Sequence, residues 1–104
     1  MSNQNPFSFL TDDPVKFNAW SLKSKLVIIL RDMVHENGWT QQEAAEALGI
    51  SQPRVSNMLK GRIDKFSIDM LYSLLFKLGF SSELTYTPAN RQEPLNMKLK
   101  RAVL

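Results

Sequence analysis

The chain has 104 residues, 43% of them hydrophobic and 22% charged, which fits one compact domain and excludes a large multidomain enzyme. Thirteen Lys and Arg against ten Asp and Glu give a formal charge of +3, a mild indication of an anionic partner. The absence of cysteine and the single histidine exclude disulfide frameworks, thiol nucleophiles and Cys/His zinc sites. We therefore expect no metal and no cofactor.

The first residues carry no basic segment, and no run reaches the roughly 18 apolar residues that a membrane span needs. We expect a soluble cytoplasmic protein with no membrane partner and no small-molecule substrate. Residues 1–12 are predicted to be an N-terminal arm, because Ser, Asn, Gln and Pro surround the cluster Phe7-Ser8-Phe9-Leu10. The two aromatic residues favour an arm that folds back on the domain.

A long first helix is predicted from about Asp13 to Asn37, opened by a capping residue followed by Pro14 and ended by Gly38. Its apolar residues recur at steps of four and three and form one stripe, made of Val15, Ala19, Leu22, Leu26, Ile29 and Met33. Four further apolar residues lie off that stripe: Phe17, Trp20, Val27 and Ile28. A helix with more than one apolar face favours a partner subunit, so we expect a homodimer.

Two short helices follow. Thr40 caps the second helix with Glu43 as its capping-box partner, and that helix spans 41–48 and ends at Gly49. Ser51 caps the third helix, whose second position is Pro53 and which runs to Leu59 or Lys60. The two helices are therefore joined by a turn of three or four residues.

Ser67 caps a fourth helix that ends at Gly79 and carries Leu71, Leu74, Leu75 and Leu78 on its core side. A strand is predicted over 83–87, where polar and apolar residues alternate until Pro88. Because a lone strand cannot satisfy its backbone groups and no second strand is evident, we expect it to pair with the same strand of a second copy. Residues 88–104 are expected to be a loosely ordered, polar basic tail. The fold class is all-α, with residues 13–87 as one domain.

The segment 40–61 has the pattern of a helix-turn-helix. The small side chain of Ala44 allows close helix approach, Gly49 permits a positive φ in the turn, and Ile50 fills the corner. Val55 and Leu59 dock the third helix on the second. These requirements, met in one register, favour a helix-turn-helix over ordinary packing of two helices.

The third helix turns a polar face away from these apolar residues, and no Asp or Glu occurs from Ser51 to Ile63. Amide, hydroxyl and guanidinium groups of this kind read base edges in the major groove. The predicted base-contacting residues are Gln52, Arg54, Ser56 and Asn57. The predicted phosphate-contacting residues, at helix starts or in the basic segment after the third helix, are Gln41, Ser51, Lys60, Arg62 and Lys65.

The stretch 38–80 resembles the Xre (lambda-repressor-like) helix-turn-helix proteins, especially in Leu-Gly-Ile-Ser-Gln-Pro-Arg-Val-Ser (48–56) followed by Leu59-Lys60-Gly61-Arg62. Within that family it is most similar to small HigA-type antitoxins and related transcriptional regulators. The resemblance spans about residues 5–88 and implies a compact lambda-repressor-like fold and homodimeric binding to a palindromic operator. In the antitoxin members it also implies neutralisation of a ribosome-dependent, mRNA-cleaving toxin encoded nearby. The positions that match the family's DNA contacts are Gln41, Gln52, Arg54, Ser56 and Asn57.

These observations predict a sequence-specific regulator of transcription, most simply a repressor, that binds double-stranded DNA. The alternative is an antitoxin whose main act is to bind its toxin through the Phe7–Leu10 arm or the second apolar face of the first helix. Catalysis is not expected, because His35 lies beside Glu36 near a helix end, where a histidine usually serves as a favourable charge. Single-stranded RNA binding is disfavoured, since residues 51–63 contain no aromatic side chain for stacking.

Overall fold

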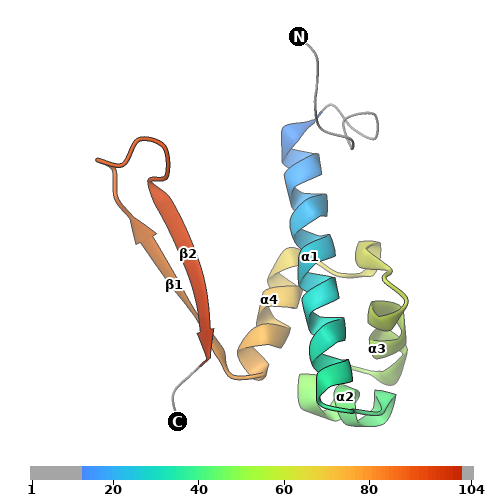
Figure 1. The fold of residues 1–104 in the computed structure, drawn as a ribbon. Helices are drawn as coiled ribbons and strands as arrows, with labels where there is room; N and C mark the ends of the chain where they lie inside the picture. Colours follow the sequence, from blue (N-terminus) through green and yellow to red (C-terminus); the bar gives the residue numbers. More distant parts are fainter. Residues whose placement is uncertain (1–12, 102–104) are drawn as a thin grey trace.

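A computed structural model describes residues 13–101, so the predicted arm of residues 1–12 lies outside the described part. Over residues 13–101, four α-helices and one 3₁₀ turn precede a two-stranded antiparallel sheet (Figure 1). The elements are α1 (Pro14–Glu36), α2 (Gln41–Leu48), α3 (Gln52–Leu59), η1 (Ile63–Lys65), α4 (Ile68–Lys77), β1 (Phe80–Tyr86) and β2 (Leu95–Arg101). The protein is therefore mostly helical, and the expected all-α fold is corrected by the presence of a small two-stranded sheet.

Each helix starts at the residue that the sequence predicts as its cap. Asp13 Oδ1 accepts a hydrogen bond from the backbone N–H of Val15 at 2.9 Å at the start of α1. The hydroxyls of Ser51 and Ser67 accept from N–H groups in the first turns of α3 and α4, each at 3.3 Å. Such caps satisfy backbone donors that have no partner within the helix, so they fix where each helix begins.

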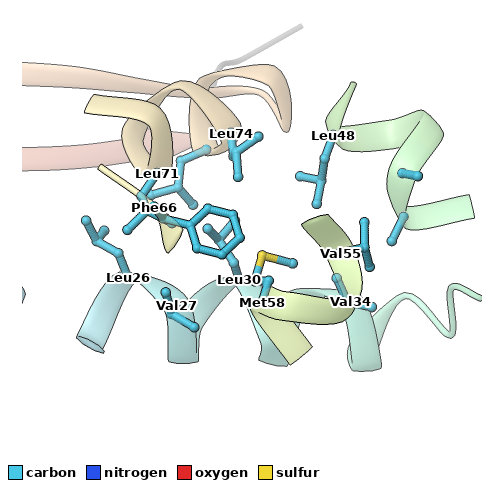
Figure 2. Close-up of a cluster of buried hydrophobic side chains, with 13 residues drawn as sticks. Leu26, Val27, Leu30, Val34, Leu48, Val55, Met58, Phe66, Leu71 and Leu74 are labelled. Atoms are coloured by element: carbon cyan, nitrogen blue, oxygen red, sulfur yellow. The ribbon is translucent and has the colours of Figure 1, made fainter. Parts of the chain in front are cut away.

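In the part of the chain that the structure describes, the helices enclose a core of thirteen buried hydrophobic residues (Figure 2). Leu30 of α1, Leu48 of α2, Met58 of α3 and Leu71 of α4 are all 0% exposed, and Phe66 enters the cluster from the segment between η1 and α4. Burying these side chains is the main favourable contribution to folding, about 1.5–3 kcal/mol for each large one. The core thereby holds α2 and α3 in one orientation against α1 and α4.

The apolar stripe predicted for α1 is partly wrong. The buried residues of this helix are Leu26, Val27, Leu30 and Val34. Val27, which was expected to face a partner, lies in the protein's own core at 1% exposure, whereas Val15 and Ile29 of the predicted stripe are exposed. The reason is that α1 carries several overlapping apolar stripes, and its contacts with α3 and α4 select among them. No residue from 14 to 25 is fully buried, so the core rests on the second half of the helix.

The strand partner expected from a second copy is present in the chain itself. β1 pairs with β2 in an antiparallel hairpin that runs from Phe80↔Arg101 to Tyr86↔Leu95. The expectations of a lone strand over 83–87 and of a loosely ordered tail over 88–104 are therefore wrong for residues 95–101. Lys100 Nζ lies 3.1 Å from a carboxylate oxygen of Glu83 across the ladder, in an exposed salt bridge.

The hairpin and α3 lie on opposite sides of the molecule, with α1 and α4 between them (Figure 1). Among residues 13–101, no helix combines the length and the apolar character needed to cross a bilayer.

Candidate nucleic-acid interface

The pair α2–α3 has the geometry of a helix-turn-helix. Thr40 and Glu43 form a complete capping box at the start of α2, with hydrogen bonds of 3.1 and 2.9 Å. Gly49 ends the helix in the left-handed conformation with φ 67°, and the N–H of Ile50 donates to Ala45 O at 3.1 Å. Ala44 is fully buried, which lets the two helices approach closely. The predicted helix-turn-helix is confirmed in both its boundaries and its turn.

The orientation of α3 follows from the side chains that it buries. Val55 and Met58 are 0% exposed and Leu59 packs partly against the core, so this side of α3 faces inward, as Figure 2 shows for the two buried residues. The opposite side, which we call the outer face of α3, comprises Gln52, Pro53, Arg54, Ser56, Asn57 and Lys60. Its first three residues and Lys60 are exposed, whereas Ser56 and Asn57 are half-buried. The four predicted base-contacting residues therefore lie on one short helix but are not equally accessible.

Arg54 is turned toward α4. Its Nη1 donates to the thioether sulfur of Met70 at 2.7 Å, although the residue as a whole is exposed. A thioether is a weak acceptor, so this contact orients the guanidinium without consuming its other donors. Arg54 can therefore leave Met70 for a guanine or a phosphate at small cost.

Asn57 is paired with Arg62, a residue predicted to contact phosphate. Arg62 Nη1 donates to Asn57 Oδ1 at 3.5 Å, the outer limit of a hydrogen bond. The amide nitrogen of Asn57 keeps its two donors, and Arg62 reaches back over the end of α3. The structure thus brings a predicted base-reading amide and a predicted phosphate-binding guanidinium into contact.

The remaining predicted phosphate contacts lie at the two ends of this unit. Gln41 is the first residue of α2, next to its cap Thr40, and Ser51 caps α3, so both stand where unpaired N–H groups favour an anion. Lys60 is the C-cap of α3 and Lys65 ends η1, and both are exposed. Gln41, Ser51 and Lys65 thus flank the outer face of α3, and Lys60 is the last residue of that face.

The sequence reasoning missed three residues that support this face. Met70 holds Arg54, and Lys77 lies over the turn, since a Cβ at Gly49 would be 2.8 Å from its Nζ. Arg31 of α1 lies beside Gly61, where a Cβ would be 3.8 Å from its Nη1. Its buried Nε has no hydrogen-bond partner among residues 13–101. Arg31 adds a positive charge behind the loop that follows α3, and only the packing of α1 on that loop reveals it.

Carboxylates stand outside the outer face of α3. Along the chain, Glu46 in α2 precedes this face, Asp64 in η1 follows it, and Asp69 lies farther on in the first turn of α4. A hydrogen bond with the Ser67 hydroxyl, aided by backbone N–H groups, lowers the pKa of Asp69 and keeps it ionised at the start of that helix. Within residues 13–101, no cluster of three or more His, Asp or Glu side chains could hold a metal ion. The chemistry on this face is donation of hydrogen bonds and positive charge.

Comparison with known proteins agrees with this geometry. A family model described as a helix-turn-helix domain matches residues 10–86. No curated protein matches the chain significantly. The matched span covers well over half of the sequence and includes every element from α1 to β1. The chain therefore belongs to the helix-turn-helix domain family.

Proposed function

We propose that the protein is a sequence-specific DNA-binding regulator of transcription that represses its target as a homodimer on a palindromic operator. The observation that carries this proposal is the outer face of α3, which is polar, free of acidic residues and exposed at Gln52 and Arg54. A helix of this kind at the second position of a helix-turn-helix enters the major groove. The match to a helix-turn-helix family supports DNA as the partner. The resemblance of residues 48–62 to Xre regulators is the reason for proposing a repressor.

Each residue of the face has a chemical role in this proposal. Gln52 pairs bidentately with an adenine, and Arg54 leaves Met70 to pair with a guanine. Asn57 turns its free amide donors outward once Arg62 moves to a phosphate, while the small Ser56 lets the helix sit close to the bases. Both rearrangements exchange a weak arginine contact, to a thioether or at 3.5 Å, for a stronger one to a base edge or a phosphate, which favours the bound state.

Affinity that does not depend on sequence comes from the ends of the unit. Lys60, Arg62 and Lys65 neutralise phosphates beyond the end of α3, and the helix starts at Gln41 and Ser51 offer backbone N–H groups. Two copies related by two-fold symmetry place their α3 helices in successive major grooves, about 34 Å apart. The protein acts by binding, and we propose no catalytic role for any residue.

Base reading is tested by Gln52→Ala, with Gln92→Ala in the exposed hairpin turn as a matched control. Fluorescence anisotropy would follow the full chain on its preferred site, found by selection from random duplexes, and on unrelated DNA. We expect Gln52→Ala to lose about 1–3 kcal/mol on the preferred site and little on unrelated DNA, and Gln92→Ala to lose nothing on either. An equal loss of Gln52→Ala on both duplexes would remove Gln52 from base reading. Equal affinity of the wild type for all sequences would refute the proposed function.

A second candidate is the antitoxin role, in which protein binding dominates. One observation favours it: Ile28 and Trp20 of α1 are 52% and 40% exposed. They are not among the residues that α1 buries in the core, which are Leu26, Val27, Leu30 and Val34. The test is co-expression with the product of the neighbouring reading frame. A stable complex that Ile28→Lys abolishes, while Lys25→Ala on the same helix leaves it intact, would support this role. Absence of any such complex would leave DNA binding as the function.

A further inference from the structure

The hairpin has two chemically distinct faces. Residues directly opposite each other in an antiparallel ladder project to the same side, and alternate residues project to opposite sides. The register therefore places six apolar residues and Ser82 and Arg101 on one side, which we call the inner face: Phe80, Leu84, Tyr86, Leu95, Met97 and Leu99. The other side carries Ser81, Glu83, Thr85, Asn96, Lys98 and Lys100. The hairpin is thus strongly amphipathic.

Among residues 13–101, the side chains that cover the inner face do so only at its base. Phe80 and Leu99 pack against the helical core, which shows that this face is turned toward the helices. Farther along the hairpin, Leu84, Tyr86 and Leu95 are 66%, 69% and 64% exposed, and Met97 is 45% exposed. A two-stranded hairpin with an unburied apolar face is marginal in water, so its outer half needs a cover.

The helices leave apolar side chains uncovered near the same place. Met33 of α1 lines a cavity together with Leu78 and Phe80, so this side of α1 faces the base of the hairpin. Ile29 lies one turn earlier on that side of α1 and is 42% exposed. On α4, Phe76 is 46% exposed and stacks on Tyr72, with ring centroids 6.3 Å apart. Figure 1 shows α4 and α1 on one side of the hairpin, and Phe80 and Leu99 pack toward them. We therefore treat the inner face of the hairpin and these helix residues as two walls of one apolar surface.

The size of this surface matches a dimer contact. If a fully exposed large apolar residue contributes about 200 Å², the exposed fractions of Leu84, Tyr86, Leu95 and Met97 amount to roughly 500 Å². Ile29 and Phe76 raise this to roughly 650 Å². A standard interface buries about 800 Å² on each partner, and soluble monomers rarely expose apolar patches this large.

The charge distribution favours a second copy as the occupant. The outer half of the inner face carries no charged residue, and Arg101 at its base lies over the Phe80 ring at 5.2 Å. Two identical copies can therefore meet here without like-charge repulsion, whereas nothing on the face would select a charged partner. A two-fold axis lets each hairpin cover the other's helices, so both walls are buried at once.

We propose that the inner face of the hairpin is the homodimer interface, with the outer half of each hairpin packed against the Ile29 and Phe76 surface of the second copy. This inference rests on the dimer in the proposed function and names its contact surface. In this dimer the two copies pack through the faces of their hairpins, whereas the sequence favoured pairing of a strand of one copy with the same strand of the other. It also leaves α3 uncovered in the dimer, because the hairpin and α3 lie on opposite sides (Figure 1).

The test compares Leu84→Glu on the inner face with Thr85→Glu, its neighbour on the opposite face of the same strand. Sedimentation velocity of the full chain over a range of concentrations gives the dimer dissociation constant. We expect a dimeric wild type, an unchanged Thr85→Glu variant, and at least about a hundredfold increase of the dissociation constant for Leu84→Glu, since two carboxylates would be buried. Circular dichroism verifies folding, and Met97→Ser, a milder change at the residue opposite Leu84, is expected to weaken the dimer without adding charge.

The outcomes separate this inference from DNA binding. A dimer that Leu84→Glu and Met97→Ser both disrupt supports the interface whatever the affinity for DNA. A wild type that stays monomeric would overturn it even if that monomer binds a single half-site, and the surface would then serve a foreign protein. Equal effects of Leu84→Glu and Thr85→Glu, or dimers that survive both inner-face changes, would overturn it as well.

Discussion

The turn between α2 and α3 depends on Gly49, and Gly49→Ala measures that dependence. The φ of Gly49 is +67°, in the left-handed region, where a residue with a Cβ costs about 1–2 kcal/mol. The three atoms nearest to an added Cβ all belong to the Lys77 side chain, the closest being Nζ at 2.8 Å. Because Nζ ends a flexible, exposed side chain, it can move away at little cost. We therefore expect a loss of about 1–2 kcal/mol in the free energy of unfolding, nearly all of it from the backbone.

Gly38→Ala is the matched control for this change. Gly38 is the second residue after α1 and has φ +65°, and nothing lies within 4 Å of its added Cβ, so the variant carries the backbone cost alone. Urea unfolding, followed by circular dichroism at one protein concentration, gives both free energies by linear extrapolation. We expect the two losses to agree within about 0.5 kcal/mol. An unchanged stability of Gly49→Ala would refute the backbone argument, and a loss several kcal/mol larger than that of Gly38→Ala would show that Lys77 is fixed in place.

Two further predictions concern the ends of the helix-turn-helix. Thr40→Ala removes the capping-box hydroxyl, which lies 3.1 Å from Glu43 N, and should lower the free energy of unfolding by about 1 kcal/mol. The control Thr87→Ala should lower it by less than about 0.5 kcal/mol, both measured by urea unfolding. Equal effects of the two changes would contradict the role of the cap. Lys60→Ala should weaken binding to every duplex alike and reduce the slope of log K against log salt by about 0.9, while Lys25→Ala on α1 leaves the slope unchanged. A salt slope that Lys60→Ala does not alter would place this lysine away from the phosphates.

Local signals in the sequence predicted the helices well. Helix caps act within a few residues and need no long-range contacts. The side chains of Thr40, Ser51 and Ser67 accept hydrogen bonds from backbone N–H groups in the first turn, and Gly49 ends α2. The boundaries of α2 and α3, and the inward side of α3, follow from these signals and from the spacing of Val55 and Met58. The helices that position the candidate site could therefore be predicted from the sequence alone.

Features that depend on distant segments were missed. Residues 95–100 alternate apolar and polar side chains, but their lysines and asparagine are poor strand formers and masked the period, so β2 became visible only as the partner of β1. On α1 the choice among overlapping stripes was made by contacts with other helices. The contact of Arg54 with Met70 likewise requires α4 to pack beside α3, which no local pattern encodes.

The composition of the buried core determines how the domain responds to protons. No ionisable residue within 13–101 belongs to that core, so folding carries no desolvation cost that changes with protonation there. Asp69, exposed at the start of α4, has a lowered pKa, and the stabilisation it provides is present above the ordinary pKa of an aspartate and is lost only as the solution turns acidic. Ionic strength is the solution variable that we expect to act on such a domain through the charges that it presents to a polyanion.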